Sequence, residues 1–428
     1  MGSERRVAQQ FSHKLLLVNQ YYVPDIASTG QFAADICNSL VKHGFEIHVV
    51  TGQPSYSASS PEAPAFEVLD GVHVYRVSLG RARGRERRLP RLAGYMRFLW
   101  GAWWSARALV KSQHFDAVLT FHNPPFVSLI GAYLAVERGL PYVFALPDIH
   151  PDFVVQGGWY LPRWLIRVWE SLNDYVFQRV DTVIVLGEGM KRNLVEDKGV
   201  PPEKVKVIPL WARPEFAPLS KDDGDPLRRE LGVRPDEFVL LYAGNMGLKE
   251  PLDPILDAAA ALEGEPVHFV FLGGGVKRGH LVARVRQERL AKVHVLPFQP
   301  EERFVQLVAA ADACFVSLKR GFERISVPSR AYTFLSAGRP LITLMAPDAD
   351  IARLVTENAC GWNVKDGDEL AQLVKSLIND REELSRRGQK AREIYEEQFR
   401  REIVLEQYAR VIQNVIRKPQ RVRNARRE

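Results

Sequence analysis

Short apolar runs alternate with amphipathic stretches along most of the chain. In the first half, runs of β-branched and other apolar residues predict strands, and the stretches between them repeat apolar positions at helical spacing. The strand runs are apolar at successive positions, which is typical of parallel strands covered by helices on both faces. The predicted strands are 14–20, 46–52, 72–77, 116–121, 141–146, 181–186 and 205–210, and the predicted helices are 29–43, 92–111, 126–138, 162–179 and 188–198.

The alternation stops once and then resumes. Residues 211–236 carry four prolines and several charges, which predict a linker ending in a short helix. Strands are predicted again at 238–244, 267–272, 293–298, 313–318 and 340–345, and a long helical stretch follows at 382–417. This βαβ rhythm predicts an α/β protein with two Rossmann-like parallel-sheet domains that face each other across a cleft. The expected division is 1–212, a linker at 213–236, 237–400, and a C-terminal helix with a basic tail at 401–428.

The composition is that of a folded protein with two concentrated basic patches. The 428 residues include 58 Lys and Arg against 51 Asp and Glu, for a net charge of +7, and 46% are hydrophobic, which excludes disorder for most of the chain. Residues 81–91 and 417–428 each hold six basic residues and one glutamate, so the rest of the chain carries about −3. A duplex-binding protein more often spreads its cations along a reading element, so the patches favour an anionic membrane or a polyphosphate over nucleic acid.

Cysteine usage and hydropathy bear on the compartment. Cys37, Cys314 and Cys360 are odd in number, far apart and without CxxC spacing, which argues against a disulfide framework or a zinc site. The apolar stretch at 15–18 is typical of a strand rather than of a signal peptide, and no uncharged apolar run approaches the roughly 18 residues of a spanning helix. The sequence therefore predicts an intracellular protein that does not cross a membrane.

The first loop with candidate binding chemistry follows the strand at 14–20, because ligands of open α/β sheets bind beyond the carboxyl ends of the strands. It ends in Thr29 and Gly30 at the start of a helix. One interpretation of this pair is a helix N-cap, and the other is a place where the backbone approaches a bound phosphate or acceptor. The loop has no GxGxxG motif, which argues against NAD or FAD.

Polar side chains also follow two later strands. His122 comes directly after the strand at 116–121, where it is either a structural histidine or a catalytic one. Asp148, His150 and Asp152 follow the strand at 141–146. These groups suit the hydroxyls of an acceptor, and they also suit an Asx-turn cluster without a ligand. Both alternatives stay open.

Three loops of the second half favour a nucleotide diphosphate. The strand at 238–244 leads into a Gly-rich turn with Lys249 just before a helix, which offers backbone donors, a helix dipole and one ammonium. The strand at 267–272 leads into three glycines that let the backbone approach a base or a ribose. After the strand at 313–318, Pro328 suits a first helical turn, so 326–329 would present free N–H groups to an anion.

Five segments resemble a known family. They are VNQYYVPDIASTGQFAADICNSLVKHGFEIHVVTGQPSY, PDIHPD, VIPLWARPEF, YAGNMGLKEPLDPILDAAAAL and SVPSRAYTFLSAGRPLI. With them, almost the whole chain resembles the retaining glycosyltransferases of family 4, which have the GT-B fold. The nearest resemblance is to the bacterial branch that builds capsule, colanic-acid or O-antigen repeat units on lipid carriers. It implies an N-terminal acceptor-binding domain, a C-terminal nucleotide-sugar-binding domain, and a last helix that returns to the first domain.

The chain departs from the family pattern at the donor site. In the family, an Arg and a Lys in the first loop of the C-terminal domain hold the donor diphosphate; Lys249 matches the Lys, whereas Asn245 stands where the family has Arg. The family also has paired glutamates, of which the second binds ribose; Thr333 stands at that position, and Ile325 lies near the first. The residues that could supply the missing positive charge are Arg330, Lys319 and Arg324.

The resemblance also implies a mechanism without a metal or another cofactor. Lys249 and the helix start at 326–329 would stabilise the leaving diphosphate, and His122 would contact the sugar or acceptor at the reacting centre. The leaving phosphate would assist the acceptor on the same face, without the two carboxylates about 5 Å apart that a retaining glycosidase needs. Closure of the domains would exclude water. The expected residues are His122 and Lys249 for catalysis; Gly244, Asn245, Gly247, Gly273, Gly274, Ser326, Val327, Pro328, Ser329, Arg330 and Thr333 for the donor; and Thr29, Gly30, Asp148 and His150 for the acceptor.

The predicted helix at 92–111 has two interpretations. At 100° per residue, Leu92, Leu99, Trp103, Ala106 and Val110 share one side, Arg97, Arg107 and Lys111 share another, and Trp100 and Trp104 lie beside the basic side. The helix either packs on its sheet with a solvated basic face, or lies in a membrane interface next to the basic patch at 81–91. The resemblance favours the second, because such enzymes must reach a polyprenyl-linked acceptor. We therefore expect a peripheral protein on the cytoplasmic face of the cell membrane, with contacts from Arg85, Arg87, Arg88, Trp100, Trp103 and Trp104.

The expected function is transfer of a sugar from a UDP- or GDP-sugar to a polyprenyl-diphosphate-linked or other glycan acceptor in bacterial surface polysaccharide synthesis. Two alternatives stay open. A UDP-sugar 2-epimerase shares the fold, but it would want catalytic carboxylates in the cleft and no lipid-facing basic helix. The absence of the family's Arg and Glu would also suit a non-catalytic partner that binds a nucleotide-sugar or a lipid.

Overall fold

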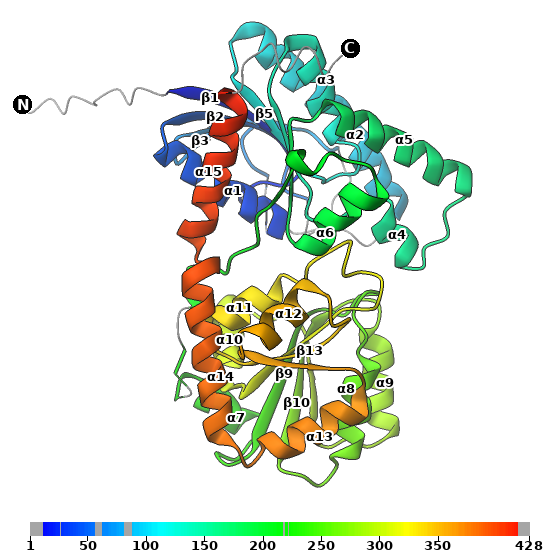
Figure 1. The fold of residues 1–428 in the computed structure, drawn as a ribbon, viewed down its shortest axis with the longest axis vertical. Coiled ribbons are helices and arrows are strands. Elements are labelled where there is room, and N and C mark those ends of the chain that lie inside the picture. Colours follow the sequence, from blue (N-terminus) through cyan, green and yellow to red (C-terminus); the bar gives the residue numbers. More distant parts are fainter. Residues whose placement is uncertain are drawn as a thin grey trace, which may run out of the picture.

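The computed structural model describes residues 12–25, 27–55, 62–80, 88–216, 219–220 and 222–417, without the side chains of 88–91. Two α/β domains lie one above the other, each with helices on both faces of a central sheet (Figure 1). This confirms the expectation of two Rossmann-like domains with parallel sheets. The basic stretch at 81–87 and residues 418–428 lie outside the described residues, so Arg85 and Arg87 are not placed.

The first domain is built on an eight-stranded sheet with the order β3-β4-β2-β1-β5-β6-β7-β8. All neighbours pair in parallel except β3, which is antiparallel to β4 at one edge. The strands are β1 (His13–Val18), β2 (Phe45–Gly52), β3 (Phe66–Leu69), β4 (Val72–Val77), β5 (Ala117–Thr120), β6 (Tyr142–Ala145), β7 (Thr182–Val185) and β8 (Val205–Val207). The helices are α1 (Ser28–Lys42), α2 (Arg88–Ser112), α3 (Ser128–Arg138), α4 (Asp152–Gln156), α5 (Arg163–Arg179) and α6 (Glu188–Arg192).

The second domain has a six-stranded, wholly parallel sheet with the order β11-β10-β9-β12-β13-β14. Its strands are β9 (Phe238–Asn245), β10 (Val267–Gly274), β11 (Val293–Leu296), β12 (Ala313–Ser317), β13 (Leu341–Leu344) and β14 (Gly361–Val364). Its helices are α7 (Asp225–Glu230), α8 (Asp253–Ala261), α9 (Arg278–Gln287), α10 (Glu301–Ala310), α11 (Arg330–Ser336), α12 (Asp350–Glu357), α13 (Gly367–Leu377) and α14 (Arg381–Ile394). Short 3₁₀ or π turns lie at Asn193–Asp197, Pro202–Lys204, Pro214–Phe216, Asp222–Gly224 and Tyr395–Phe399.

The central strands are apolar at successive positions because both faces of each sheet are covered. In β1, Leu15 and Leu17 belong to the core beneath α1, whereas Leu16 and Val18 belong to the core on the opposite face, which includes residues of α2 and α3. All four side chains are fully buried. Burial of this kind contributes about 1.5–3 kcal/mol for each large aliphatic side chain, so the doubly covered strands hold the frame from which the loops extend.

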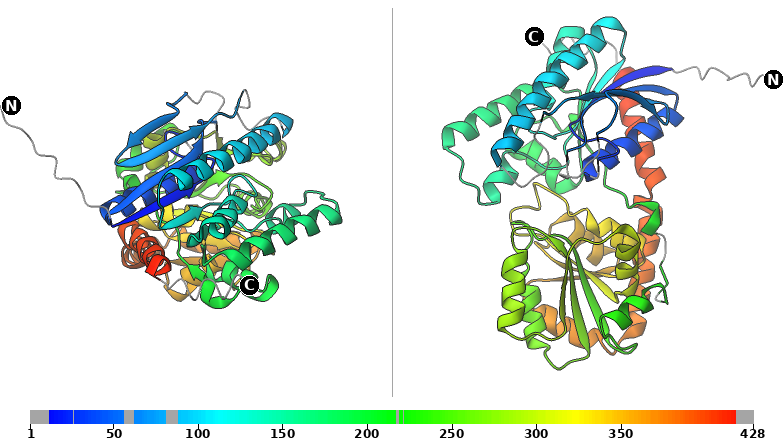
Figure 2. Two further views of the ribbon diagram at one scale, coloured as in Figure 1. Left: turned by 90° about the horizontal axis from the view of Figure 1, so that it is seen from above. Right: turned by 180° about the vertical axis from the view of Figure 1, so that it is seen from behind.

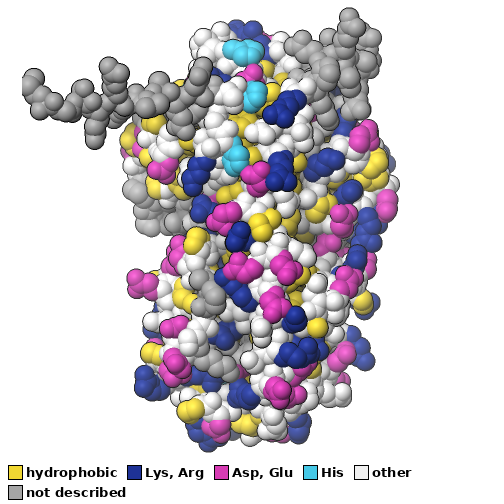
Figure 3. All heavy atoms as spheres, turned by 60° about the vertical axis from the view of Figure 1, so that its left-hand side comes forward, with side chains coloured by type: hydrophobic (Ala, Val, Ile, Leu, Met, Phe, Trp, Pro, Cys, Tyr) yellow, Lys and Arg dark blue, Asp and Glu magenta, His cyan; other side chains and the backbone are white. Residues whose placement is uncertain are grey.

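The long helical stretch predicted at 382–417 is two helices. α14 packs on the second domain, and α15 (Arg401–Arg417) packs on α1 of the first (Figure 1). Between them the chain leaves helical geometry at Arg400, where ψ is 137°. Val404, Tyr408 and Ile412 of α15 are buried in the core of the first domain. Seen from the side of these two helices, basic and acidic side chains are interspersed (Figure 3).

Candidate functional site

Two loops meet across the space between the domains. Asp148, after β6, and Ser326, before α11, form an isolated antiparallel bridge, and the amide of Ile149 donates to the carbonyl of Ile325 at 3.0 Å. Both loops follow the carboxyl end of a strand, which is where ligands of α/β sheets bind. The predicted acceptor-side and donor-side segments are therefore in direct contact.

His122 and Asp148 form a pair on the first domain's side of this contact. Nε2 of His122 lies 3.6 Å from Oδ2 of Asp148, and His122 is 8% exposed. Burial alone would raise the pKa of Asp148, but the polar contact with His122 and the positive charge of Lys249 outweigh burial and hold this pKa well below its usual range. Nδ1 of His122 is buried and has no hydrogen-bond partner among the described residues. Asp148 is therefore anionic at neutral pH, and His122 keeps one nitrogen available to a ligand.

His150 lies next to this pair and stays neutral. Its ring centroid is 5.6 Å from that of His122. Burial, together with the positive charge of His122, lowers the pKa of His150 to about 4. Both rings line a partly open pocket, and the other lining residues are Pro125, Phe126, Ser128, Phe144, Leu146, Trp169, Asn173 and Phe177. The pocket combines aromatic walls with a few polar atoms, as small-molecule sites do.

Lys249 lies on the second domain's side of the contact. Its ammonium donates to the hydroxyl of Ser326 at 2.9 Å and lies 5.3 Å from the centroid of the Phe153 ring of α4. The carbonyl of Lys249 accepts the amide of Lys319 at 2.7 Å, which ties the loop after β9 to the loop after β12. The ammonium therefore sits between the donor-side loops and the anionic Asp148.

Glycines at the ends of β9 and β10 allow these two segments to touch. Gly273 has φ +138°, and a Cβ there would lie 1.9 Å from the carbonyl oxygen of Gly244. Gly275 has φ +135°, and its Cβ would lie 2.5 Å from the carbonyl oxygen of Met246. Only glycine fits both the backbone angles and the space. Around them, Gly247 donates its amide to the half-buried Glu250 at 3.1 Å, Asn245 is exposed, and the ring of Phe298 covers Gly274.

Arg330, the first residue of α11, is a candidate cation of the donor site. A Cβ added to Gly244 would meet Cγ of Arg330 first, at 3.8 Å, and the Arg330 guanidinium carbon lies 4.9 Å from the centroid of the Phe304 ring. Among the described residues no carboxylate lies within ion-pair distance of Arg330. Burial lowers its pKa, and the nearby charge of Arg213 adds to this effect. Within the described ranges, its charge is therefore not neutralised by a carboxylate beside the end of β9.

The other two candidate cations are placed differently. Arg324 pairs with Glu196 and Asp197 of the first domain at 2.7 and 3.2 Å, so its charge is neutralised. The side chain of Lys319 is exposed.

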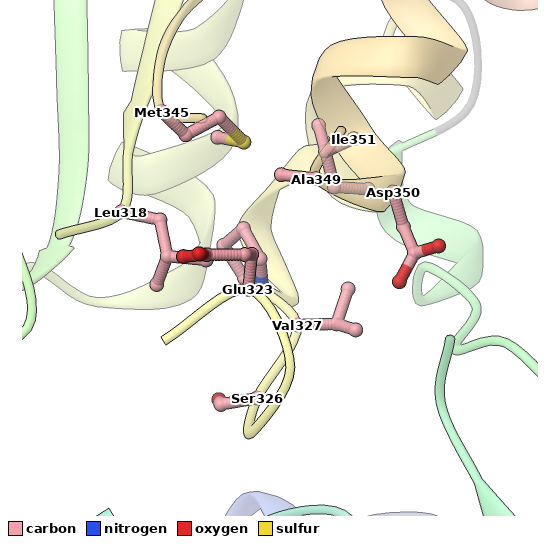
Figure 4. Close-up of a pocket in the computed structure, with 9 residues that line it drawn as sticks. Leu318, Glu323, Ser326, Val327, Met345, Ala349, Asp350 and Ile351 are labelled. Carbon is pink, nitrogen blue, oxygen red and sulfur yellow. The ribbon is translucent and has the colours of Figure 1, made fainter. Parts of the chain in front are cut away.

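The segment at 326–329 differs in part from the prediction of free N–H groups. The amide of Ser326 donates to the carbonyl of Phe322 at 3.0 Å, and α11 begins only at Arg330. Ser326, Val327 and Pro328 line a narrow pocket with about 170 Å³ of empty space, together with Leu318, Glu323, Met345, Ala349, Asp350 and Ile351 (Figure 4). Ser329 is exposed before α11, and Thr333 is buried within it. The hydroxyl of Ser326, rather than its amide, is the group that meets Lys249.

Thr29 and Gly30 serve the packing of α1. The amide of Gly30 donates to the carbonyl of Ala27 at 2.9 Å, and a Cβ at Gly30 would lie 3.0 Å from the backbone nitrogen of Tyr22. In this structure Gly30 makes its close approach to the preceding loop, and its predicted contact with a ligand stays a prediction. The hydroxyl of Thr29 accepts the side-chain amide of Asn123 at 3.4 Å, next to His122.

A second contact between the domains involves Asp350 at the start of α12. Its carboxylate accepts the amides of Glu188 and Gly189 at the start of α6, both at 3.1 Å. Figure 4 shows this carboxylate directed away from the pocket and toward the first domain. Burial raises the pKa of Asp350, and the two amides oppose that rise. We call these three groups the clasp. The arrangement suits a helix N-terminus, where a negative charge is stabilised.

The outer face of α2 corrects the predicted helix faces. Phe98, Ala102, Ala106 and Val110 face the core. The ring centroid of Trp103 lies 4.0 Å from that of Tyr133, and Trp103 is partly buried against the core, so it is less exposed than the other two predicted Trp contacts of this helix. The side chain of Arg88 lies outside the described residues. The large apolar side chains that α2 exposes follow a four-residue spacing, and they are Leu92 (59%), Met96 (61%), Trp100 (68%) and Trp104 (50%).

One group of side chains in the described part of the chain has a metal-ligand composition. Glu46, His48 and His73 lie on β2 and β4, with their ligand atoms within 4.8 Å of one another. The ammonium of Lys14 lies 2.8 Å from the Glu46 carboxylate and opposes a cation there. These three residues also lie on strands away from the loops of Lys249 and His122.

Several residues of the site carried no signal in the sequence. Phe153 and Trp169 resemble ordinary core aromatics on helices, and Asp350 resembles a helix-start acid. Their roles depend on how the two domains meet, which local patterns do not encode.

Two family models match the chain. The model described as "Glycosyl transferase 4-like domain" matches residues 29–211, and the model described as "Glycosyl transferases group 1" matches residues 223–394. Together they cover both domains, including the loops of His122 and Lys249. The chain belongs to the family 4 glycosyltransferases of the GT-B fold.

Curated relatives and solved structures agree with this family. The glycosyltransferase is 25% identical over 319 residues to the probable glycosyltransferase WbjE of Pseudomonas aeruginosa, which covers 73% of this chain and 78% of WbjE. It is 23% identical over 348 residues to the putative colanic acid biosynthesis glycosyl transferase WcaI of Escherichia coli, which covers 76% and 81%. Its fold matches HepE of Anabaena, solved with UDP, with a TM-score of 0.69, 17% identity, and coverage of 94% and 100%. None of the helices in the described ranges of this glycosyltransferase is long and apolar enough to span a bilayer.

Proposed function

We propose that this glycosyltransferase moves a sugar from a UDP- or GDP-sugar to a polyprenyl-diphosphate-linked or other glycan acceptor in bacterial surface polysaccharide synthesis. The observation that carries the proposal is the placement of Lys249 at the carboxyl end of the second sheet, across from the His122–Asp148 pair of the first. The names of WcaI and HepE support it, since one is a colanic acid enzyme and the other was solved with UDP and with UDP-glucose.

On the donor side, the nucleoside diphosphate would lie over the carboxyl ends of β9, β10 and β12. The glycines at 273–275 keep this backbone close to the segment at the end of β9, and the exposed Phe298 offers an aromatic face beside it for the base. Lys249 would neutralise the charge that develops on the leaving diphosphate. Arg330 would supply the second positive charge, in place of the arginine that Asn245 replaces, because it has no carboxylate partner in the described part of the chain.

We propose transfer with retention and without a metal, as expected from the family. The carboxylate at the centre of the site, Asp148, is held by His122 and faces Lys249. In this role it orients an acceptor hydroxyl instead of attacking the sugar. As the bond between the anomeric carbon and the phosphate breaks, the leaving phosphate oxygen would take the proton of the acceptor hydroxyl. The acceptor oxygen would then bond to the anomeric carbon on the same face of the sugar. His122 would direct its free Nδ1 to the sugar or the acceptor.

Water must be kept from the activated sugar, and the interdomain contacts serve this purpose. Two contacts join the domains near segment 326–328, which lines the narrow pocket. One is the bridge between Asp148 and Ser326, and the other is the clasp at Asp350. Closure excludes water that would otherwise hydrolyse the donor.

The acceptor domain would rest on the cytoplasmic leaflet through α2. Its exposed Trp100 and Trp104 suit the headgroup depth of a bilayer, and the basic stretch at 81–91 next to it suits anionic lipid. Flotation with anionic liposomes tests this surface. Replacement of Arg85, Arg87 and Arg88 by Glu should abolish binding, and undiminished binding would refute it.

The transfer reaction is tested by release of a nucleoside diphosphate from UDP- and GDP-sugars in the presence of a polyprenyl-diphosphate-linked sugar. We expect release to depend on the acceptor, and the new glycosidic bond to keep the anomeric configuration of the donor, as read by NMR coupling constants. Inversion would refute retention. Release of no nucleoside diphosphate from any nucleotide-sugar, with any acceptor, would refute the function.

A further inference from the structure

The connection between α4 and α5 exposes an unusual number of aromatic side chains. Trp159 is 50% exposed, Tyr160 is 91% exposed and Trp164 is 65% exposed. Val168, one turn further along α5, is 48% exposed. We call residues 157–168 the aromatic tip. Figure 1 shows α5 at the outer edge of the first domain, with the chain looping from it back to α4.

The charge of the aromatic tip has one sign. Arg163 and Arg167 are exposed within it, and no Asp or Glu occurs between residues 157 and 169. A surface of Trp and Tyr mixed with Arg suits the interface of an anionic bilayer, where the rings lie at headgroup depth and the guanidinium groups meet lipid phosphates. Such a surface would be costly to leave in water without a partner.

The tip belongs to the same helical layer as the exposed stripe of α2. α5 packs on α3, and α3 packs on α2, so the three helices form one layer on a single face of the first sheet. The view from behind shows the same layer on one side of the domain (Figure 2). Between the two ends of the layer, Val136 of α3 is also 49% exposed. The aromatic tip and the α2 stripe thus belong to helices of one layer of the first domain.

The opposite face of α5 lines the pocket beside the reacting centre. Trp169 and Asn173 are within three turns of Trp164, and both line the pocket that His122 and His150 also line. Asn173 donates to the carbonyl of His150 at 2.6 Å, which fixes α5 to the loop of Asp148. A single helix thus has the membrane-like surface at its start and the candidate acceptor pocket on its inner face.

We propose that the aromatic tip is a membrane contact that docks on an anionic bilayer and brings the sugar of a lipid-linked acceptor to the pocket at His122. The inference rests on the proposed function for the identity of the acceptor. It assigns residues that the α2 surface does not include, and it commits to a lipid bilayer as the partner.

The test is binding of the full-length protein to vesicles with and without anionic phospholipid. We expect Tyr160→Ser with Trp164→Ser to lower the partition coefficient on anionic vesicles at least about ten-fold. Arg163→Gln with Arg167→Gln should lower it about 25-fold, since each basic residue near an anionic surface is worth about 1 kcal/mol. The matched control is Phe66→Ser, an aromatic that is 51% exposed on the edge strand β3 and should leave binding unchanged.

Two activity measurements separate this inference from the function itself. With a long-chain lipid acceptor in vesicles, the tip variants should have a raised acceptor KM; with a short, water-soluble acceptor, their rates should match the wild type. Melting temperature and nucleotide binding should also match, which shows that the variants fold. Three outcomes would overturn the inference. The tip variants could bind vesicles as well as the wild type does, or the wild type could bind no vesicles. The variants could also lose binding to a protein partner while keeping their binding to vesicles. Failure of the wild type with every acceptor would instead overturn the proposed function.

Discussion

The ammonium of Lys249 donates a hydrogen bond to the hydroxyl of Ser326 at 2.9 Å, and through it the loop after β9 meets the loop after β12. Ser326 in turn forms a bridge with Asp148 of the first domain. One cation thus lies where both donor-side loops and the acceptor-side carboxylate converge. A charge in this position suits a diphosphate that leaves during transfer.

Replacement of Lys249 by Ala should lower kcat/KM for transfer, because a preorganised donor to the leaving group is lost. The expected loss of transition-state stabilisation is roughly 2–4 kcal/mol. Steady-state kinetics with the nucleotide-sugar donor measures this. Lys319→Ala is the control, since only the backbone amide of Lys319 joins the Lys249 loop and its side chain is exposed. Unchanged turnover in Lys249→Ala would remove Lys249 from the mechanism.

Arg330→Gln should weaken binding of the nucleoside diphosphate about 10- to 100-fold, because hydrogen bonds to charged groups contribute about 1.5–3 kcal/mol each. Calorimetric titration with UDP or GDP measures this loss. If Arg330 takes over the role of the family's arginine, adding Asn245→Arg to Arg330→Gln should restore part of the affinity.

Arg320→Gln is the matched control, because Arg320 is an exposed arginine in the same loop region. Equal affinity in wild type and Arg330→Gln would show that Arg330 does not touch the diphosphate. A double variant no tighter than Arg330→Gln would show that the two positions are not interchangeable.

Gly187→Ala should open the clasp. Gly187 has extended backbone angles (φ −159°), so alanine brings no backbone strain, yet its Cβ would lie 2.1 Å from Oδ2 of Asp350. We expect a lower kcat and faster hydrogen exchange at the amides of 188 and 189, since domain closure completes the site. Gly279→Ala, where a Cβ meets nothing within 4 Å, should change neither. Unaltered exchange in Gly187→Ala would contradict the clasp.

The folded protein should lose stability as the pH falls from about 6.5 toward 4. Burial, with the charge of His122, lowers the pKa of His150 to about 4, below the ~6.5 of an unfolded chain. Between these values the unfolded chain binds a proton that the folded chain does not, so stability is full above pH 6.5 and declines below it. At pH 4 this histidine accounts for a loss of up to roughly 3 kcal/mol in the free energy of unfolding. His150→Gln should remove that loss, so the free energy of unfolding measured by chemical denaturation should fall less steeply with pH.

His294 provides a comparison in the other domain. Burial and the charge of His268 lower its pKa to about 4 as well, so His294→Gln should flatten the decline over the same window without altering transfer. A pH dependence of stability that neither variant changes would show that these histidines are not buried in their neutral form.

The sequence predicted most of the frame because local apolar patterns determine it. The strands that carry His122 and Lys249 were predicted within a few residues of their observed bounds. Two short strands were missed: β3 pairs only at an edge, and β14 contains Gly361 and Asn363, so neither has a run of β-branched residues. The helical stretch at 382–417 was predicted as continuous, since no proline or glycine marks the break at Arg400, although the expected division already starts the C-terminal helix at 401.

The contacts between the domains and the orientation of α2 could not be predicted. Helical periodicity groups residues into faces but does not say which turn of a helix lies over the sheet. Leu92 was grouped with the buried side and is 59% exposed, whereas Trp103, predicted to contact the membrane, packs on Tyr133. The bonds of Ser326 with Lys249 and of Asp350 with α6 depend on how two separately folded domains meet.

The central claim is that a nucleotide-sugar binds at Lys249, and a thermal-shift comparison of wild type and Lys249→Ala with a panel of UDP- and GDP-sugars tests it most directly. A ligand that binds only the folded state raises Tm, because it stabilises that state. The stabilisation is about 2.7 kcal/mol when the ligand concentration is 100 times its Kd. We predict a rise for the wild type with at least one member of the panel and a smaller rise for the variant. No rise with any nucleotide-sugar, or equal rises in both proteins, would contradict the claim.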